Sequence, residues 1–127
     1  MKKLLTILII ILINFCARAQ LQTNPSIGDN QIVTYRLFST TNIWNFIKLD
    51  TRNGQLWQVQ WSTGDNRFVS DLSVVSQVTK EDEKIGRFTL QATQNINTFL
   101  LLDQIDGRVW QVQWSVDHEK RGIIRIY

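Results

Sequence analysis

Cysteine is nearly absent from this sequence, since Cys16 is the only one in 127 residues. It lies in an N-terminal segment that we expect to be removed, so the rest of the chain would carry no thiol. Without cysteine, a chain can form neither disulfides nor thiolate metal sites. The fold is therefore expected to be held together by noncovalent packing alone.

Histidine is equally scarce, and recognisable catalytic motifs are missing. His118 is the only histidine, in a charged stretch at residues 117–121 where a solvated turn is expected. The sequence has no phosphate-binding glycine-rich loop, no serine nucleophile elbow and no His-x-x-x-His pair. Catalysis needs converging nucleophilic or titratable groups, and Asp50, Asp103 and His118 are the acid–base set most readily proposed. We predict no enzyme, no catalytic residues, no metal and no cofactor.

The first residues have the order of a secretory signal peptide. Met1 and two lysines precede an apolar run over residues 4–15, and Ala17-Arg18-Ala19, with a small residue on each side of the arginine, comes before Gln20. This run is shorter than the roughly 20 residues that a membrane-spanning helix needs. We therefore predict a signal peptide over residues 1–19, cleaved after Ala19. The protein is then exported to the periplasm, the cell surface or the extracellular space.

Cys16 raises the alternative of a bacterial lipoprotein, which carries its lipid on a cysteine at the end of such a segment. Phe15 directly precedes it. Lipoprotein signals have a small residue at that position, so we favour a thiol that leaves with the signal peptide.

The apparent basic character of the chain also belongs to this segment. The sequence has 14 basic and 11 acidic residues, and Lys2, Lys3 and Arg18 are among the basic ones. The chain beyond Ala19 is therefore neutral. A neutral chain gives no reason to expect a nucleic-acid or anionic-membrane patch. We predict no nucleic-acid partner and no membrane association after signal cleavage.

The remaining chain contains one unit written twice. Residues 42–62 and 95–115 are identical at 12 of 21 positions, with a constant offset of 53 and no gap. Self-similarity at a fixed period indicates a repeat architecture. The predicted organisation is a flexible leader over residues 20–30 and a single β domain over residues 31–127, made of repeat 1 (31–80) and repeat 2 (81–127).

Each repeat alternates short β-rich segments with turn residues, which is typical of antiparallel strands. The sequence predicts an all-β fold of two tandem antiparallel meander repeats, with about eight strands. The packing of the repeats stays open between barrel-like and propeller-blade-like. The predicted strands cover residues 32–39, 44–49, 55–62 and 67–75 in repeat 1, and residues 85–92, 98–102, 108–115 and 122–127 in repeat 2.

Asp50 and Gly54, matched by Asp103 and Gly107, mark the sharpest predicted hairpin turns. Glycine adopts positive φ without strain, and the aspartate can accept backbone N–H bonds. These turns offer at most two oxygen-bearing side chains each, whereas Ca²⁺ takes roughly six to eight oxygens. We therefore expect the carboxylates to cap the turns.

Pairing of Asp50 with Gln55 across the turn sets the register, and counting outward assigns the two faces of each sheet. One face carries most of the aromatic residues, and we expect it to be the core face in both repeats. The opposite face is mixed and carries the glutamines. The predicted core residues are Trp44, Phe46, Lys48, Trp57, Val59 and Trp61 in repeat 1, and Phe99, Leu101, Trp110, Val112 and Trp114 in repeat 2.

This hairpin locally resembles the Asp-x-x-x-Gly-x-x-Trp element of Trp-bearing β-propeller blades, such as those of quinoprotein-type repeats. The resemblance covers about a dozen residues in each repeat. It implies blade-like sheets, of which two cannot close a propeller, although three chains of two blades could, as in some small lectins. The residues that carry it are Leu49, Asp50, Gly54 and Trp57, with Leu102, Asp103, Gly107 and Trp110 as their equivalents.

Tryptophan and glutamine give the one positive indication of function. Exposed indoles stack on sugars or fill pockets of a partner, and amides supply directional hydrogen bonds. We predict a non-catalytic binding module for a glycan or a protein surface. The same pattern also fits simple core packing. The candidate binding residues are Trp44, Trp57, Trp61, Trp110, Trp114, Gln58, Gln60, Gln111 and Gln113.

Two further indications bear on this prediction. Trp44 has no aromatic equivalent in repeat 2, where Asn97 stands, so the shared architecture requires it least. The alternative function is a structural or assembly protein whose duplicated unit closes a core or oligomerises, with no small-molecule ligand.

Overall fold

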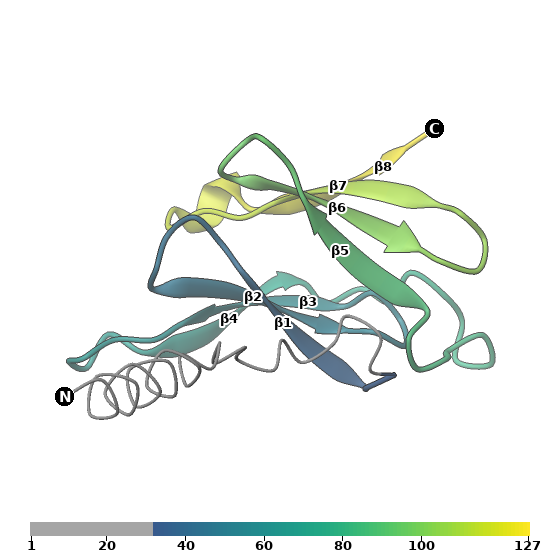
Figure 1. The fold of residues 1–127 in the computed structure, drawn as a ribbon, viewed down its shortest axis with the longest axis horizontal. Coiled ribbons are helices and arrows are strands. Elements are labelled where there is room, and N and C mark those ends of the chain that lie inside the picture. Colours follow the sequence, from purple (N-terminus) through teal and green to yellow (C-terminus); the bar gives the residue numbers. More distant parts are fainter. Residues whose placement is uncertain (1–31) are drawn as a thin grey trace, which may run out of the picture. The chain divides into compact units, whose positions relative to one another are not determined.

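Eight short strands form nearly all the secondary structure of residues 32–127, the part of the chain that this computed structural model describes (Figure 1). No helix in this part is long and apolar enough to cross a membrane. The predicted signal peptide (1–19) and leader (20–30) lie outside it. The strands are β1 (Tyr35–Ser39), β2 (Asn45–Asp50), β3 (Leu56–Gln60) and β4 (Phe68–Ser73) in repeat 1, and β5 (Phe88–Ala92), β6 (Thr98–Asp103), β7 (Val109–Gln113) and β8 (Gly122–Ile126) in repeat 2, with a 3₁₀ turn η1 (His118–Lys120) before β8.

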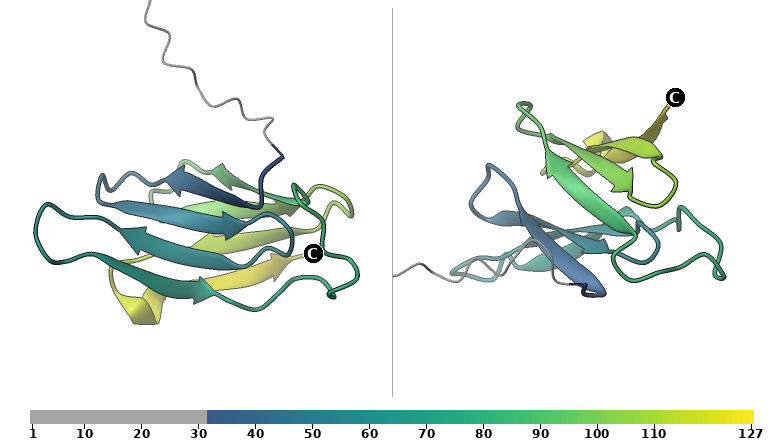
Figure 2. Two further views of the ribbon diagram at one scale, coloured as in Figure 1. Left: turned by 90° about the horizontal axis from the view of Figure 1, so that it is seen from below. Right: turned by 45° about the vertical axis from the view of Figure 1, so that its right-hand side comes forward.

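Each repeat forms its own four-stranded sheet. The strand orders are β1-β2-β3-β4 and β5-β6-β7-β8, and every neighbouring pair is antiparallel. Both sheets are therefore simple meanders, and they lie one over the other (Figure 2). The predicted all-β fold of two meander repeats is confirmed. The sheets stay open, so their layout is that of stacked blades and not of a closed barrel.

The predicted hairpin register is also confirmed. The backbone N–H of Asp50 donates to the carbonyl of Gln55 at 2.9 Å, and Asp103 donates to Arg108 at the same distance. Both turn glycines have positive φ, 79° at Gly54 and 73° at Gly107. The Asx-Gly sequence was therefore sufficient to locate both turns and the strand pairs that flank them.

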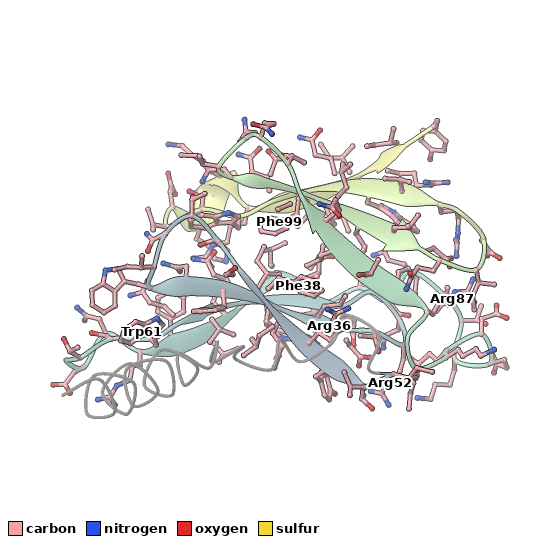
Figure 3. The ribbon with its side chains drawn as sticks, viewed as in Figure 1. Arg36, Phe38, Arg52, Trp61, Arg87 and Phe99 are labelled. Atoms are coloured by element: carbon pink, nitrogen blue, oxygen red, sulfur yellow. The ribbon has the colours of Figure 1, made fainter. Side chains whose placement is uncertain are left out.

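One hydrophobic core lies between the two sheets. Phe38 and Phe99 point toward each other from opposite sheets (Figure 3). The backbone N–H of Phe88 also donates to the carbonyl of Thr51 in the other repeat at 2.8 Å. Two open sheets thus share one core. Its buried apolar residues are Ile47, Leu49, Leu56 and Leu72 of repeat 1 and Phe88, Leu90, Phe99, Leu101, Trp110, Val112 and Trp114 of repeat 2.

The predicted core face is correct for repeat 2 and wrong for repeat 1. Repeat 1 buries Ile47, Leu49 and Leu56, which belong to the face predicted to be mixed. The reason is geometric, because the two sheets stack in the same orientation. The face of repeat 1 that carries Ile47 therefore packs against the non-equivalent face of repeat 2, which carries Trp110. Equivalent faces of two sheets stacked in this way cannot both point into the space between them. The face wrongly assigned to the core in repeat 1 carries Trp44, Phe46, Lys48, Trp57, Val59 and Trp61.

Gln58 is the one buried glutamine among residues 32–127. Its side chain is fully buried, and its amide nitrogen donates to Oδ1 of Asn45 at 2.7 Å. Asn45 is buried as well. The amide nitrogen of Gln58 is therefore hydrogen-bonded, as buried polar groups usually are, whereas its amide oxygen has no hydrogen-bond partner among the described residues.

The two turn glycines predict unequal responses to the same substitution. A Cβ at Gly54 would lie 3.1 Å from Cγ of Gln77 and 3.2 Å from Cδ1 of Phe88, whereas a Cβ at Gly107 would meet nothing within 4 Å. Gly107→Ala should cost about 1 kcal/mol through the positive φ alone. Gly54→Ala should cost about 2–3 kcal/mol because overpacking is added. Urea unfolding of both variants measures this difference, and equal losses would contradict the position of Phe88.

Candidate functional site: the aromatic face of repeat 1

The outward face of repeat 1 carries the counterparts of side chains that repeat 2 buries. Successive residues of a strand point to opposite faces, so burial of Ile47 and Leu49 turns their neighbours in β2 outward. The exposed members include Leu37, at 62%, and Tyr35, at 52%. We call this surface the aromatic face and define it by Tyr35, Leu37, Trp44, Phe46, Lys48, Trp57, Val59, Trp61 and Val69.

Trp61 and its counterpart Trp114 show the contrast most clearly. Each indole nitrogen donates to a backbone carbonyl, Trp61 to Ile43 at 2.8 Å and Trp114 to Ile96 at 3.1 Å. Yet Trp61 is 44% exposed and Trp114 only 4%. In Figure 3, Trp61 lies far from Phe38 and Phe99 in the core. The same locally fixed side chain is thus core in one repeat and surface in the other.

Trp44 extends the aromatic face at the same end of the sheet. Its ring centroid lies 4.6 Å from that of Trp61, with the planes tilted by 49°. Tilted and offset pairs of this kind are favourable. Asn97, its counterpart in repeat 2, instead donates from its side chain to the carbonyl of Trp114 at 3.2 Å. Trp44 is 37% exposed. This agrees with the sequence, in which repeat 2 has no aromatic residue at the equivalent position.

Lys48 places a positive charge among the aromatic side chains, and the guanidinium of Arg52 lies 5.8 Å from the ring centroid of Tyr35. Its ammonium lies 4.4 Å from the ring centroid of Trp57 and 5.7 Å from that of Tyr35. Cation–π contacts of this type are attractive and orient the ammonium. On β4, the exposed Asp71 pairs in register with Trp57. The aromatic face therefore combines apolar rings with the ammonium of Lys48, and it borders the guanidinium of Arg52 and the carboxylate of Asp71.

The structure divides the nine predicted binding residues among several places. It brings Trp44, Trp57 and Trp61 together on the aromatic face. The other six are distributed as follows: Trp110, Trp114 and Gln58 lie in the core; Gln60 donates from its side chain to the carbonyl of Asn66 at 3.0 Å; and Gln111 and Gln113 are exposed on the outward side of repeat 2.

Sequence reasoning missed Tyr35, Leu37 and Val69 as members of this surface. Tyr35 and Leu37 alternate along β1, so a two-residue period was the signal for a shared face. It could not say which face was outward, because the decision depends on the stacking of the repeats.

The turn aspartates form a second cluster, and its role is structural. Asp103 accepts two bonds from Arg87, each at 3.0 Å, and one from Arg108 at 2.9 Å. It also accepts the backbone N–H of Ile105, as Asp50 accepts that of Arg52. The predicted capping is confirmed. Within residues 32–127 no group of three or more His, Cys, Asp or Glu side chains could hold a metal ion.

His118 lies apart from this cluster. It starts η1, between β7 and β8, and is exposed. The Asp103 turn is at the other end of β7, a strand of five residues that spans about 17 Å. The structure therefore does not bring His118 and Asp103 together.

Shallow pockets occur elsewhere on the described surface. One of about 200 Å³ is lined by Gln111, Gln113, Lys120 and neighbouring residues, and one of about 190 Å³ lies between the turns that precede β2 and β6. A third, of about 390 Å³, lies beside Asp106 and Arg108. None of these three includes a residue of the aromatic face, which is a broad surface.

Comparison with protein-family models, with curated proteins and with solved structures found no match to this chain. The role of the aromatic face therefore rests on its chemistry and on its relation to the buried face of repeat 2.

The paired tryptophans give a direct test of which faces are buried. Trp114→Ala should cost about 3–5 kcal/mol, as expected for a fully packed indole. Trp61→Ala loses an equivalent hydrogen bond but a partly exposed ring, so it should cost only about 1 kcal/mol. Urea unfolding of the two variants measures both values. A larger loss at Trp61 would mean that the core faces are assigned the wrong way round.

The Asp103 cluster predicts a specific pH dependence. Burial by itself raises the pKa of Asp103, but the bonds from Arg87, Arg108 and the backbone lower it from 3.8 to about 2. Between about pH 2 and pH 4, the Asp103 carboxylate therefore binds fewer protons in the native protein than in the unfolded chain. About 2 kcal/mol of stability should be present above pH 4 and be lost as the pH falls toward 2.

Urea unfolding at pH 7, 4 and 2.5 tests this prediction with Asp103→Asn. The variant should be less stable than wild type at pH 7, and the gap should narrow as the pH falls. Asp65→Asn, in the exposed loop before β4, is the matched control and should follow the wild-type curve. A gap that stays constant with pH would contradict the predicted direction.

Proposed function

We propose that this chain is an exported, non-catalytic binding module that recognises a protein surface through the aromatic face of repeat 1. The observation that carries the proposal is the exposure of Trp61 at 44%, against 4% for its counterpart Trp114. A side chain that one repeat uses as core is left open to solvent in the other. Contiguous exposed apolar patches are unusual on monomeric proteins and typically mark interaction sites.

The composition of the aromatic face favours a protein partner. Tyrosine and tryptophan are enriched where proteins bind one another, and they carry much of the binding energy. Tyr35, Trp57 and Trp61 lie on different strands or strand ends and supply such anchors. Lys48 and Asp71 add charges that can set the orientation of a partner.

A glycan is the competing ligand, and the arrangement favours it less. Small ligands bind in concave sites with converging polar groups. The pockets near the glutamines and near Asp106 do not include the aromatic rings. Gln58 and Gln60, which the sequence offered as hydrogen-bonding partners for a sugar, are turned inward or bonded to the chain itself.

Site-specific photo-crosslinking tests the proposal in the producing cells. A photoreactive amino acid replaces Leu37 on the aromatic face, or Val116 in the β7–β8 loop as the control, in the full chain with its own N-terminal segment. Both positions are exposed, at 62% and 70%. We expect a crosslinked protein product from position 37 and none from position 116.

Two results would overturn the proposal. One is equal crosslinking from both positions, which would mean that contacts on this chain are not selective. The other is no crosslink from position 37 together with saccharide binding on a glycan array that Trp57→Ser abolishes. A constant melting temperature among the variants ensures that a lost signal is not a lost fold.

A further inference from the structure

We infer that the partner of the aromatic face is the outward face of repeat 2 in a second copy of this chain, so that copies associate head to tail. This inference rests on the proposed function and names its partner. It comes from the interface between the two repeats of one chain, where an aliphatic face already packs against an aromatic face.

The interface between the repeats has a direction. Repeat 1 contributes its aliphatic face, with Ile47 and Leu49 buried, and repeat 2 contributes its aromatic one, with Trp110 and Val112 buried. Two equivalent units that join through different faces leave one face of each kind unused. An interface of this heterologous type can repeat from one molecule to the next. The unused pair is the aromatic face of repeat 1 and the outward face of repeat 2.

The outward face of repeat 2 matches the face that repeat 1 buries. Leu100 and Leu102 are the counterparts of the fully buried Ile47 and Leu49. On β8, Ile124 is 68% and Ile126 44% exposed, although neither is charged or polar. This surface, which we call the aliphatic face, consists of Leu100, Leu102, Val109, Gln111, Ile124 and Ile126. Both halves of the internal interface therefore exist a second time on the outside.

A local detail at the turn glycines supports the same match. Inside the chain, the ring of Phe88 lies against Gly54, with Cδ1 3.2 Å from the site of a Cβ. The counterparts of these residues are Tyr35 and Gly107. Tyr35 is 52% exposed, and the space at Gly107 is empty within 4 Å. The open position at Gly107 is where the Tyr35 ring of a second copy would lie.

Among the positions that depart from the internal interface, Lys48 and Ser70 show why contact between copies is weaker. Lys48 stands where repeat 2 has the fully buried Leu101, so contact between copies would partly desolvate an ammonium. Arg121 donates to Ser70 across the internal interface at 2.8 Å, and the counterpart of Ser70 is Ile124, which cannot accept that bond. Contact between copies is therefore weaker than contact between repeats, as expected for chains that fold first and assemble afterwards.

The number of copies in the assembly depends on whether this stacking closes into a ring. A heterologous contact gives a ring if the rotation closes and a filament if it does not. Propellers close with roughly four to eight four-stranded blades around an axis. Because each chain has two sheets, a closed ring would hold roughly two to four copies.

Light scattering on the full chain, purified after export, tests the inference over a range of concentrations. Wild type should have a mass of two to four chains. Leu37→Glu on the aromatic face and Ile124→Glu on the aliphatic face should each weaken association at least about tenfold. Both side chains are more than half exposed, so the folds should stay intact. Val116→Glu, at an equally exposed position away from both faces, should behave as wild type.

Mixing the two disrupted variants tests the direction of the contact. Leu37→Glu keeps an intact aliphatic face and Ile124→Glu an intact aromatic face, so their mixture should form one-to-one pairs that neither forms alone. A symmetric contact between two aromatic faces predicts the opposite, namely that Ile124→Glu alone still associates. Such association would overturn the inference.

Lys48→Leu provides a gain-of-function test. It restores the leucine found at the buried equivalent position, so it should tighten association about tenfold by removing the cost of desolvating the ammonium. A weaker or unchanged affinity would contradict the assigned match between the aromatic and aliphatic faces.

The same experiments separate this inference from the proposed function. If wild type is a single chain at all concentrations while position 37 crosslinks another protein, the inference fails and the proposed function stands. If position 37 crosslinks nothing and the protein is monomeric, the aromatic face has no partner in another molecule. The inference and the proposed function then both fail. Self-crosslinking from positions 37 and 124, but not 116, supports both.

Discussion

The packing of the aliphatic side of one sheet on the aromatic side of the next is the contact on which the rest of this structure depends. Neither repeat has a second sheet of its own, and a single four-stranded sheet needs a partner to bury its apolar face. Leu49 and Trp110 meet that need from opposite sheets. The repeats are nearly the same unit stacked in the same orientation. The contact between them therefore buries the aliphatic side of repeat 1 and the aromatic side of repeat 2, and it leaves the other side of each sheet exposed to solvent.

The proposed function and the proposed assembly both depend on this single constraint. The aromatic face is exposed because repeat 1 packs on repeat 2 through its opposite face, and the aliphatic face is exposed because repeat 2 packs on repeat 1 through its aromatic side. In repeat proteins each unit contacts only its neighbours, and the end units usually carry a polar outer surface. The outward faces of these two repeats carry apolar residues such as Trp57 and Ile124. These residues are the physical reason for treating the two faces as binding surfaces.

The charged clusters stabilise the hairpin turns between the strands of each sheet. In the turn before β7, Asp103 pairs with Arg87 and Arg108. In the turn before β3, Asp50 pairs with Arg52. Removal of one partner from a buried pair leaves an uncompensated charge, which is costly. These groups therefore contribute to stability and its pH dependence, while the proposed recognition uses mainly neutral side chains.

The sequence by itself determined the local structure: the duplication, the strands, the Asx-Gly turns and the register that puts Lys48 opposite Trp57. These features depend on backbone geometry and on residues close in the chain. Only the tertiary structure decided that Trp57 and Trp61 face outward while Trp110 and Trp114 are buried. Both faces of each sheet carry enough apolar residues to form a core, so alternation could not choose between them. The choice depends on the direction of stacking, which is a contact between repeats that no pattern within one repeat records.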